Sequence, residues 1–177
     1  MTAPLNERGA TIQLLAMDVD GVLTDGSLYF AASGDELKAF SILDGQGLRL
    51  IQKQGLITAF ITGRTSPLTE ARARNLDIGY LIQGRTDKLT ALRELSERTS
   101  IPLDAIAYVG DDLPDLAAIE AAGIGISVPN GCAAVRGSAD WCTTTPGGSG
   151  AIREVCEWLL ACRGEIGRAS CRERVYT

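Results

Sequence analysis

Two carboxylates one residue apart, Asp18 and Asp20, stand at the end of the first apolar run of the sequence, residues 12–19. Ligands of open α/β sheets bind beyond the carboxyl ends of the strands, so a strand here would present both side chains to a ligand. Such a pair can divide the work of group transfer, because one carboxylate can attack while the other moves a proton. An Asx turn that ends the strand is the alternative interpretation.

Three further carboxylates, Asp111, Asp112 and Asp115, follow a later apolar run, residues 105–109. Crowded acids repel each other unless a cation or a hydrogen-bonding cap relieves them. Capping of a helix by Asp112 ahead of Pro114 would account for one of the three. Carboxylate oxygens suit Mg²⁺, which keeps several waters and needs few protein ligands. The sequence therefore favours a magnesium site at this cluster.

A hydroxyl and a lysine stand between the two groups of carboxylates. Thr62 follows the apolar run of residues 57–61, where its hydroxyl could bond a phosphoryl oxygen or, alternatively, cap a helix. Lys88 opens a predicted helix, at the end where the helix dipole does not favour a positive charge. It is one of three lysines in the chain, beside Lys38 and Lys53, and a solvated side chain is the ordinary alternative for any of them.

The composition excludes several other kinds of chemistry. The chain has 177 residues, with 17 Lys and Arg, 22 Asp and Glu, a net charge of −5 and no histidine. Without histidine there is no Ser-His-Asp triad and no histidine ligand for zinc. An acidic chain repels polyphosphate backbones, so nucleic acid is not an expected partner. An anionic substrate must be held by local positive charge or by a metal.

The cysteines and the amino-terminal segment indicate the cellular compartment of the protein. The five cysteines are odd in number and form no C-x-x-C pair, so we expect reduced thiols in a cytoplasm. The first residues carry Glu7 and only a short apolar run that ends in carboxylates, which is not the pattern of a signal peptide. No stretch approaches the roughly 18 apolar residues of a membrane span. We therefore expect a cytoplasmic protein with no membrane partner.

Apolar runs alternate with amphipathic stretches along the chain, a pattern typical of a parallel sheet covered by helices on both faces. The predicted strands are residues 12–19, 57–61, 80–82, 105–109 and 124–128, and the predicted helices are residues 44–54, 66–76, 88–98, 114–122 and 151–162. After the first strand, residues 27–31 and 37–40 flank a Ser33-Gly34-Asp35 turn and predict a hairpin. We expect one doubly wound α/β domain, residues 1–164, and a flexible or non-native tail, residues 165–177.

The order of carboxylate pair, hydroxyl, lysine and carboxylate cluster resembles the haloacid dehalogenase superfamily of phosphotransferases with an aspartate nucleophile. Thr62 follows Asp18 by 44 positions, Lys88 follows Thr62 by 26, and Asp111 follows Lys88 by 23. The resemblance implies a Rossmann-like core in which Asp18 attacks phosphorus. It implies that Asp20 protonates the leaving oxygen and then activates water, which favours a phosphatase over a dehalogenase.

The resemblance also implies how the site binds phosphate and metal. Thr62 and Lys88 would bind phosphoryl oxygens. Asp18, the backbone carbonyl of Asp20, and Asp111 would hold Mg²⁺. The remaining acids of the late cluster, Asp112 or Asp115, would act through the waters of the metal.

The gaps around Thr62 and Lys88 leave no room for a cap domain of ordinary size, so we expect a capless member. Catalysis gains from excluding water, so we expect a second subunit to cover the open site and the protein to be a homo-oligomer. The segments MDVDGVLTDGSLYF, IQGRTDKL and ADWCTTTPGGSGAIREVCEWLL resemble the capless phosphatases of 3-deoxy-D-manno-octulosonate 8-phosphate, homotetramers of lipopolysaccharide sugar synthesis. Ser149 stands where relatives often carry arginine.

This closer resemblance implies that the hairpin, residues 26–40, helps to build a tetramer. It implies that Gly63, Arg64 and Arg85 contact a sugar-acid phosphate, with a solvated side chain as the alternative for either arginine.

Three other functions are weighed against this one. A nine-carbon ulosonic acid 9-phosphate is a second possible substrate, because motif residues do not separate one-carbon homologues. A receiver-like phosphoacceptor domain is a different class of protein, disfavoured because its acids precede the threonine and lysine. A dinucleotide-binding protein is weaker still, because Gly45-Gln46-Gly47 lacks the third glycine of the fingerprint.

Overall fold

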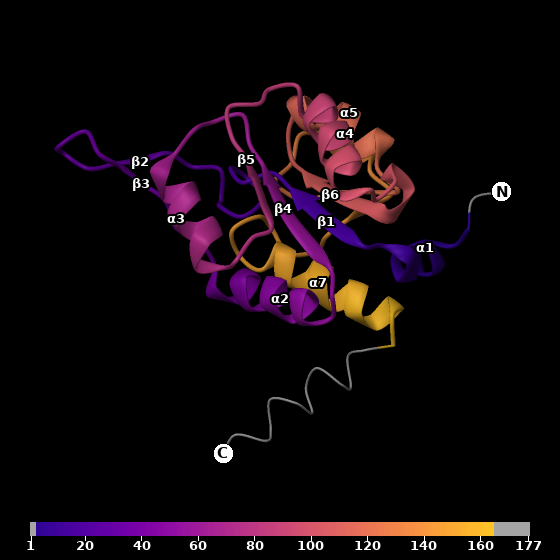
Figure 1. Ribbon diagram of the computed structural model, residues 1–177. Helices are drawn as coiled ribbons and strands as arrows, with labels where there is room; N and C mark the ends of the chain where they lie inside the picture. Colours follow the sequence, from indigo (N-terminus) through magenta and orange to yellow (C-terminus); the bar gives the residue numbers. More distant parts are fainter. Residues whose placement is uncertain (1–2, 165–177) are drawn as a thin grey trace, which may run out of the picture.

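The first predicted strand forms β1 (Leu14–Met17), which lies in the interior of a six-stranded sheet in a computed structural model that describes residues 3–164 (Figure 1). The strand order is β5-β4-β1-β6-β7-β8, and every neighbouring pair is parallel. The other strands are β4 (Ile57–Ile61), β5 (Tyr80–Ile82), β6 (Ile106–Gly110), β7 (Ile124–Ser127) and β8 (Trp141–Cys142). The predicted tail, residues 165–177, lies outside the described residues.

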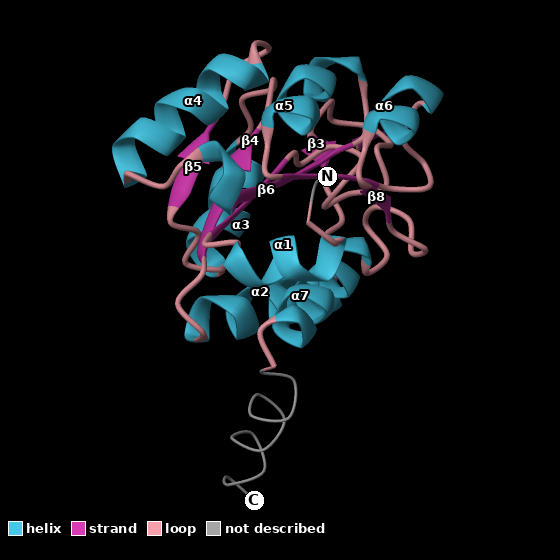
Figure 2. Ribbon diagram, turned by 90° about the vertical axis from the view of Figure 1, so that its right-hand side faces the viewer, coloured by secondary structure: helices cyan, strands magenta, loops and turns pink. Residues whose placement is uncertain are grey.

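Helices cover both faces of the sheet, as Figure 2 shows for α4, α5 and α6 on one side and α1, α2 and α7 on the other. Leu15 and Met17 of β1 pack into the core under α2 and α7, while Leu14 and Ala16 pack under α4 and α5. A strand buried on both faces reads as an unbroken apolar run, which is why β1 shows no alternation. The helices are α1 (Leu5–Thr11), α2 (Ile42–Lys53), α3 (Pro67–Asn75), α4 (Lys88–Thr99), α5 (Leu116–Ala121), α6 (Ala133–Ser138) and α7 (Ala151–Cys162).

This architecture confirms the predicted doubly wound α/β fold, and the described residues include no cap domain. Ser66 caps α3 by accepting a hydrogen bond from the Leu68 N–H at 3.3 Å, with Pro67 in the first turn, as the sequence predicts. The helix predicted from Asp44 begins two residues earlier, because Ser41 provides its cap. Asp44 is instead buried in the first turn, where it accepts the Arg153 N–H of α7 at 2.9 Å.

The predicted hairpin is present but shorter than expected. Its strands are β2 (Tyr29–Phe30) and β3 (Glu36–Leu37), paired antiparallel, and the Ala31 N–H donates to the Asp35 carbonyl across the turn. The second strand ends before residues 38–40 because Phe40 turns back to pack against the main core. Figure 1 shows the hairpin standing out from the body of the molecule.

Several small elements escaped prediction, namely α1, α6 and β8. The helix predicted over residues 114–122 is divided into a 3₁₀ turn, Leu113–Asp115, and α5. The four described cysteines are free thiols, one of them fully buried. Within residues 3–164, each helix is too short or too polar to pass through a lipid bilayer.

Candidate active site

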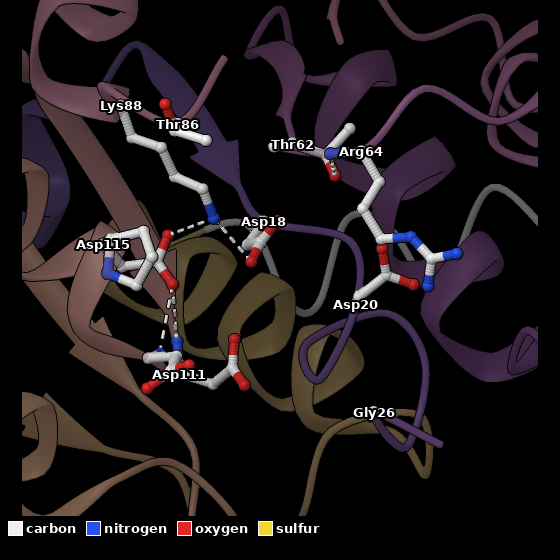
Figure 3. Close-up of a pocket in the computed structure, with 12 residues that line it drawn as sticks. Asp18, Asp20, Gly26, Thr62, Arg64, Thr86, Lys88, Asp111 and Asp115 are labelled. Atoms are coloured by element: carbon white, nitrogen blue, oxygen red, sulfur yellow. Dashed lines mark hydrogen bonds and ion pairs between the residues drawn. The ribbon is translucent and has the colours of Figure 1, made fainter. Parts of the chain in front are cut away.

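A cavity of about 300 Å³ opens where β1, β4 and β6 end, at the carboxyl edge of the sheet (Figure 3). It is lined by every predicted site residue except Arg85, namely Asp18, Asp20, Thr62, Gly63, Arg64, Lys88, Asp111, Asp112 and Asp115. Gly26, Thr86 and Pro114 complete the lining. The topology therefore brings to one place residues that are spread over nearly a hundred positions of sequence.

Asp18 is held at the end of β1 by backbone and side-chain contacts. Its N–H donates to the Val109 carbonyl of β6 at 2.9 Å, and its Oδ1 accepts the Val19 N–H at 2.7 Å. Its Oδ2 lies 2.6 Å from the Lys88 Nζ. Burial raises the pKa of Asp18 to about 6, and the charge of Asp115 adds to this while Lys88 opposes it. The carboxylate is therefore fixed in one orientation at the cavity floor.

Lys88 bridges Asp18 and Asp115, as the dashed lines of Figure 3 show. Burial alone would lower the pKa of Lys88, but the charges of Asp18 and Asp115 outweigh burial and raise that pKa. The lysine is 3% exposed and stays charged inside the protein. The solvated alternative for Lys88 is therefore wrong.

Asp115 is fully buried and uses both oxygens as acceptors. Its Oδ1 accepts from the Lys88 Nζ and from the Tyr108 hydroxyl, each at 2.7 Å. Its Oδ2 accepts the N–H groups of Asp111 and Asp112, at 3.1 and 3.2 Å. Sequence reasoning missed Tyr108, because nothing in an apolar strand marks the partner of one hydroxyl. Asp115 thus organises the lysine and the loop after β6.

Asp111 offers the donor atoms that a cation needs. Its Oδ1 is buried without a hydrogen-bond partner, and burial together with the charges of Asp18 and Asp115 raises its pKa to about 7. Asp18, Asp111 and Asp115 each place one oxygen within 4.8 Å of the others. Both oxygens of Asp115 are already hydrogen-bonded, so the carboxylates left for a cation are those of Asp18 and Asp111, whose oxygens fit Mg²⁺. Asp112 instead caps the 3₁₀ turn by accepting the Leu113 N–H at 2.8 Å, as one reading of the cluster predicts.

Gly21 directly follows Asp20 in the loop after β1, and its conformation lets this loop approach Asp111. Its φ is +91°, and a Cβ at this position would lie 2.1 Å from the Asp111 Oδ2. Its carbonyl accepts a hydrogen bond from the Asn130 amide at 2.8 Å, and Asn130 accepts the Gly147 N–H at 2.7 Å. Asn130, which sequence reasoning missed, thus joins the loop after β1 to the turn before α7.

Asp20 and Arg64 lie on the side of the cavity opposite Asp115 (Figure 3). The Asp20 carboxylate contacts the Lys38 ammonium, which comes from the segment just after β3. Glu36 of the hairpin lies 3.5 Å from Lys38 and 2.8 Å from Arg64. Sequence reasoning counted Lys38 but gave it no role; its rarity in the chain was the one available signal.

Thr62 lines the cavity, whereas Arg85 does not. Thr62 is buried at the end of β4, and its Oγ1 accepts the Arg64 N–H at 3.3 Å, which leaves the hydroxyl proton to donate. It caps no helix, because α3 begins later at Pro67 with Ser66 as its cap. The two terminal guanidinium nitrogens of Arg85 each donate to a carboxylate oxygen of Glu94 in α4, at 2.9 Å.

The chain is similar to proteins of known activity over nearly its full length. Residues 68–154 match the family model of haloacid dehalogenase-like hydrolases. The 3-deoxy-D-manno-octulosonate 8-phosphate phosphatase KdsC of Escherichia coli K12 is 40% identical over 96% of this chain and 90% of its own length.

Solved structures agree. The 3-deoxy-D-manno-octulosonate 8-phosphate phosphatase of Moraxella catarrhalis, in complex with magnesium, phosphate and KDO, is 46% identical with a TM-score of 0.93. The match covers 95% of this chain and 97% of that one. A probable YrbI family phosphatase of Pseudomonas syringae is 43% identical, with a TM-score of 0.94 and 98% of each chain covered. The chain therefore belongs to the haloacid dehalogenase-like hydrolases, within the family of 3-deoxy-D-manno-octulosonate 8-phosphate phosphatases.

Proposed function

We propose that this protein is a Mg²⁺-dependent phosphatase that hydrolyses 3-deoxy-D-manno-octulosonate 8-phosphate to the free sugar acid and phosphate. The observation that carries the proposal is the buried Asp18 carboxylate, bound to Lys88 and beside the unpartnered Asp111 oxygen, at the carboxyl edge of the sheet. The family relationship supports the substrate.

The reaction has two steps that share Asp18 and Asp20. An Asp18 oxygen attacks phosphorus, the bond from phosphorus to the sugar oxygen breaks, and that oxygen leaves with the bonding electrons and takes a proton from Asp20. Water then attacks the phosphorus of the aspartyl phosphate and gives its proton to Asp20. The bond to Asp18 breaks, which releases phosphate and restores Asp18 as a carboxylate and Asp20 as the protonated acid that begins the next cycle.

The other groups stabilise charge and hold position. Lys88 and Thr62 bind phosphoryl oxygens through an ammonium and a hydroxyl that are both buried. Asp18, the backbone carbonyl of Asp20, and Asp111 would hold Mg²⁺, which supplies positive charge to the phosphoryl oxygens.

Asp115 and Asp112 take different parts in this scheme. Both oxygens of Asp115 are occupied, so we assign it to orienting Lys88 and the loop that carries Asp111. Asp112 is engaged in capping, so any contact with metal-bound water is secondary to that.

Arg64 is the better candidate to meet the carboxylate of the sugar acid. It lines the cavity and its side chain is 43% exposed, so it is free to exchange part of its contact with Glu36 for a ligand. Arg85 is held against Glu94 and would have to leave that pair first.

We also propose that the protein is a cytoplasmic homotetramer built through the hairpin. Four apolar side chains of this small element are largely exposed, namely Leu28, Tyr29, Phe30 and Leu37. A projecting apolar element of this kind is a typical subunit interface. The free cysteines are consistent with a reducing compartment. A monomeric mass for the native protein in light scattering would contradict the assembly.

The test of the activity is phosphate release with Mg²⁺ from the eight-carbon acid phosphate, its nine-carbon 9-phosphate counterpart and common sugar phosphates. The expected result is a strong preference for the eight-carbon compound. Turnover of only the nine-carbon acid or of other phosphates would keep the mechanism and discard the substrate. A stable phosphoprotein without turnover would favour the phosphoacceptor function.

A further inference from the structure

A lysine from the hairpin reaches into the main body of the protein. The side chain of Lys38 is only 3% exposed, although it follows the projecting strand β3. A buried ammonium is stable only when it is paired, and Lys38 has two partners, the Asp20 Oδ1 and, at 3.5 Å, the Glu36 Oε1. The hairpin therefore makes a charged contact with the active-site loop.

The Asp20 carboxylate depends on that contact for its orientation. Within residues 3–164, Lys38 is the side chain that binds it, and the Asp20 side chain is otherwise 25% exposed at the cavity wall. Asp18, by contrast, is fixed by a backbone N–H and by Lys88. A carboxylate on a loop with one partner turns freely once that partner is removed.

We propose that Lys38 is a positioning residue for the reaction: it holds Oδ1 of Asp20, so that Oδ2 faces the substrate oxygen that receives the proton. The inference rests on the proposed function, in which Asp20 is the acid of the first step. Glu36 lies 3.5 Å from the same ammonium and adds a second negative charge beside it.

A leaving-group comparison separates positioning from mere stability. An alkoxide needs a proton as it leaves, whereas p-nitrophenolate leaves without one. The specificity constant kcat/KM reports the steps up to the cleavage of the phosphate ester. A misplaced Asp20 should therefore lower kcat/KM for the sugar-acid phosphate and leave kcat/KM for p-nitrophenyl phosphate nearly unchanged.

The experiment compares Lys38→Met with the wild type on 3-deoxy-D-manno-octulosonate 8-phosphate and p-nitrophenyl phosphate. The expected loss in kcat/KM is about 100-fold on the sugar-acid phosphate, the usual scale for a displaced catalytic group, and less than about threefold on the aryl ester. Lys38→Arg should restore part of the loss, because it keeps a donor for Oδ1. The matched control is Lys53→Met, the same change at an exposed lysine of α2.

Retained turnover of the aryl ester also reports that the variant is folded, and Lys38→Gln provides a second variant if Lys38→Met is not. Equal losses on both substrates, or no loss on either, would overturn the inference while the proposed function stands. A wild-type protein that releases phosphate from neither compound would overturn the proposed function and the inference with it.

Discussion

Two lysines bind the two carboxylates of the Asp18–Asp20 pair, and different kinds of structure support them. Lys88 opens α4 and lies in a buried network with Asp115 and Tyr108, whose parts come from the sheet and its helices. Lys38 comes from a two-stranded hairpin whose outer side chains are exposed. The core sets the geometry of Asp18, the proposed nucleophile, whereas Asp20, the proposed acid, has its side-chain partner on a projecting segment.

The difference separates the geometry that the buried core provides from the geometry that the hairpin provides, the element that we propose to join subunits. A change in the Lys88 network should alter phosphoryl transfer itself, for every substrate alike. A change in the hairpin should act on the protonation of the leaving oxygen and should depend on the association of subunits. The following variants test this separation, from the largest expected effect to the smallest.

Asp18→Asn should reduce kcat/KM by on the order of 10⁴-fold or more on all substrates, because the amide does not attack phosphorus. The side chains are nearly isosteric, so thermal unfolding should change little. The control is Asp77→Asn, an exposed position at φ +53° where asparagine is well tolerated. Activity above a few per cent of wild type would contradict the assignment of the nucleophile.

Lys88→Ala should lower kcat/KM by roughly 10²–10³-fold, by analogy with the removal of one preorganised donor to transition-state charge. Unlike Lys38→Met, it should affect p-nitrophenyl phosphate as strongly as the sugar-acid phosphate, because it acts on the transferred phosphoryl group. Steady-state kinetics on both substrates decides this. A loss confined to the sugar-acid phosphate would remove the distinction between the two lysines.

Phe30→Asp should weaken the association of subunits by about 30-fold, the change that corresponds to a truncated interface side chain worth about 2 kcal/mol. Phe30 is 64% exposed on the hairpin. Light scattering over a dilution series measures the association, and turnover of the sugar-acid phosphate should fall over the same range. Ala32→Asp places the same charge on the exposed turn without removing an apolar side chain. Activity that ignores dilution would uncouple the hairpin from catalysis.

Tyr108→Phe should lower kcat/KM by about fivefold and the free energy of unfolding by about 1 kcal/mol, the usual contribution of one buried hydrogen bond. The Asp115 Oδ1 would keep its contact with Lys88 and lose only the hydroxyl. Tyr80→Phe is the control, because that ring keeps its contact with Arg98. If both variants behave alike, the Tyr108 hydroxyl has no part in the network.

The sequence predicts the site well where the chemistry follows from the sheet. The proximity of Asp18, Thr62 and Asp111 could be predicted, because each follows a long apolar run and the carboxyl ends of parallel strands meet at one edge of the sheet. The main strands and α7 were also predictable from their runs of apolar residues. Short elements such as α6 and β8 were not, because a few residues do not establish a period.

Roles that depend on tertiary contacts could not be predicted. Tyr108 looks like any core residue until Asp115 is placed beside it. Lys38 acquires its role only because the hairpin ends early and turns its side chain toward Asp20. The pairing of Arg85 with Glu94 likewise arises from the packing of a loop against α4.

Gly21 bears on which substitutions this site can accept over evolutionary time. Its backbone conformation disfavours side chains, and any Cβ there would collide with the Asp111 carboxylate. Gly34 in the hairpin turn has nearly the same φ, +89°, but has nothing within 4 Å of an added Cβ. In a library of random variants, position 34 should tolerate asparagine and aspartate, whereas position 21 should retain only glycine. Substitution in the hairpin turn therefore has little cost, whereas position 21, in the loop after β1 and against the Asp111 carboxylate, is restricted to glycine.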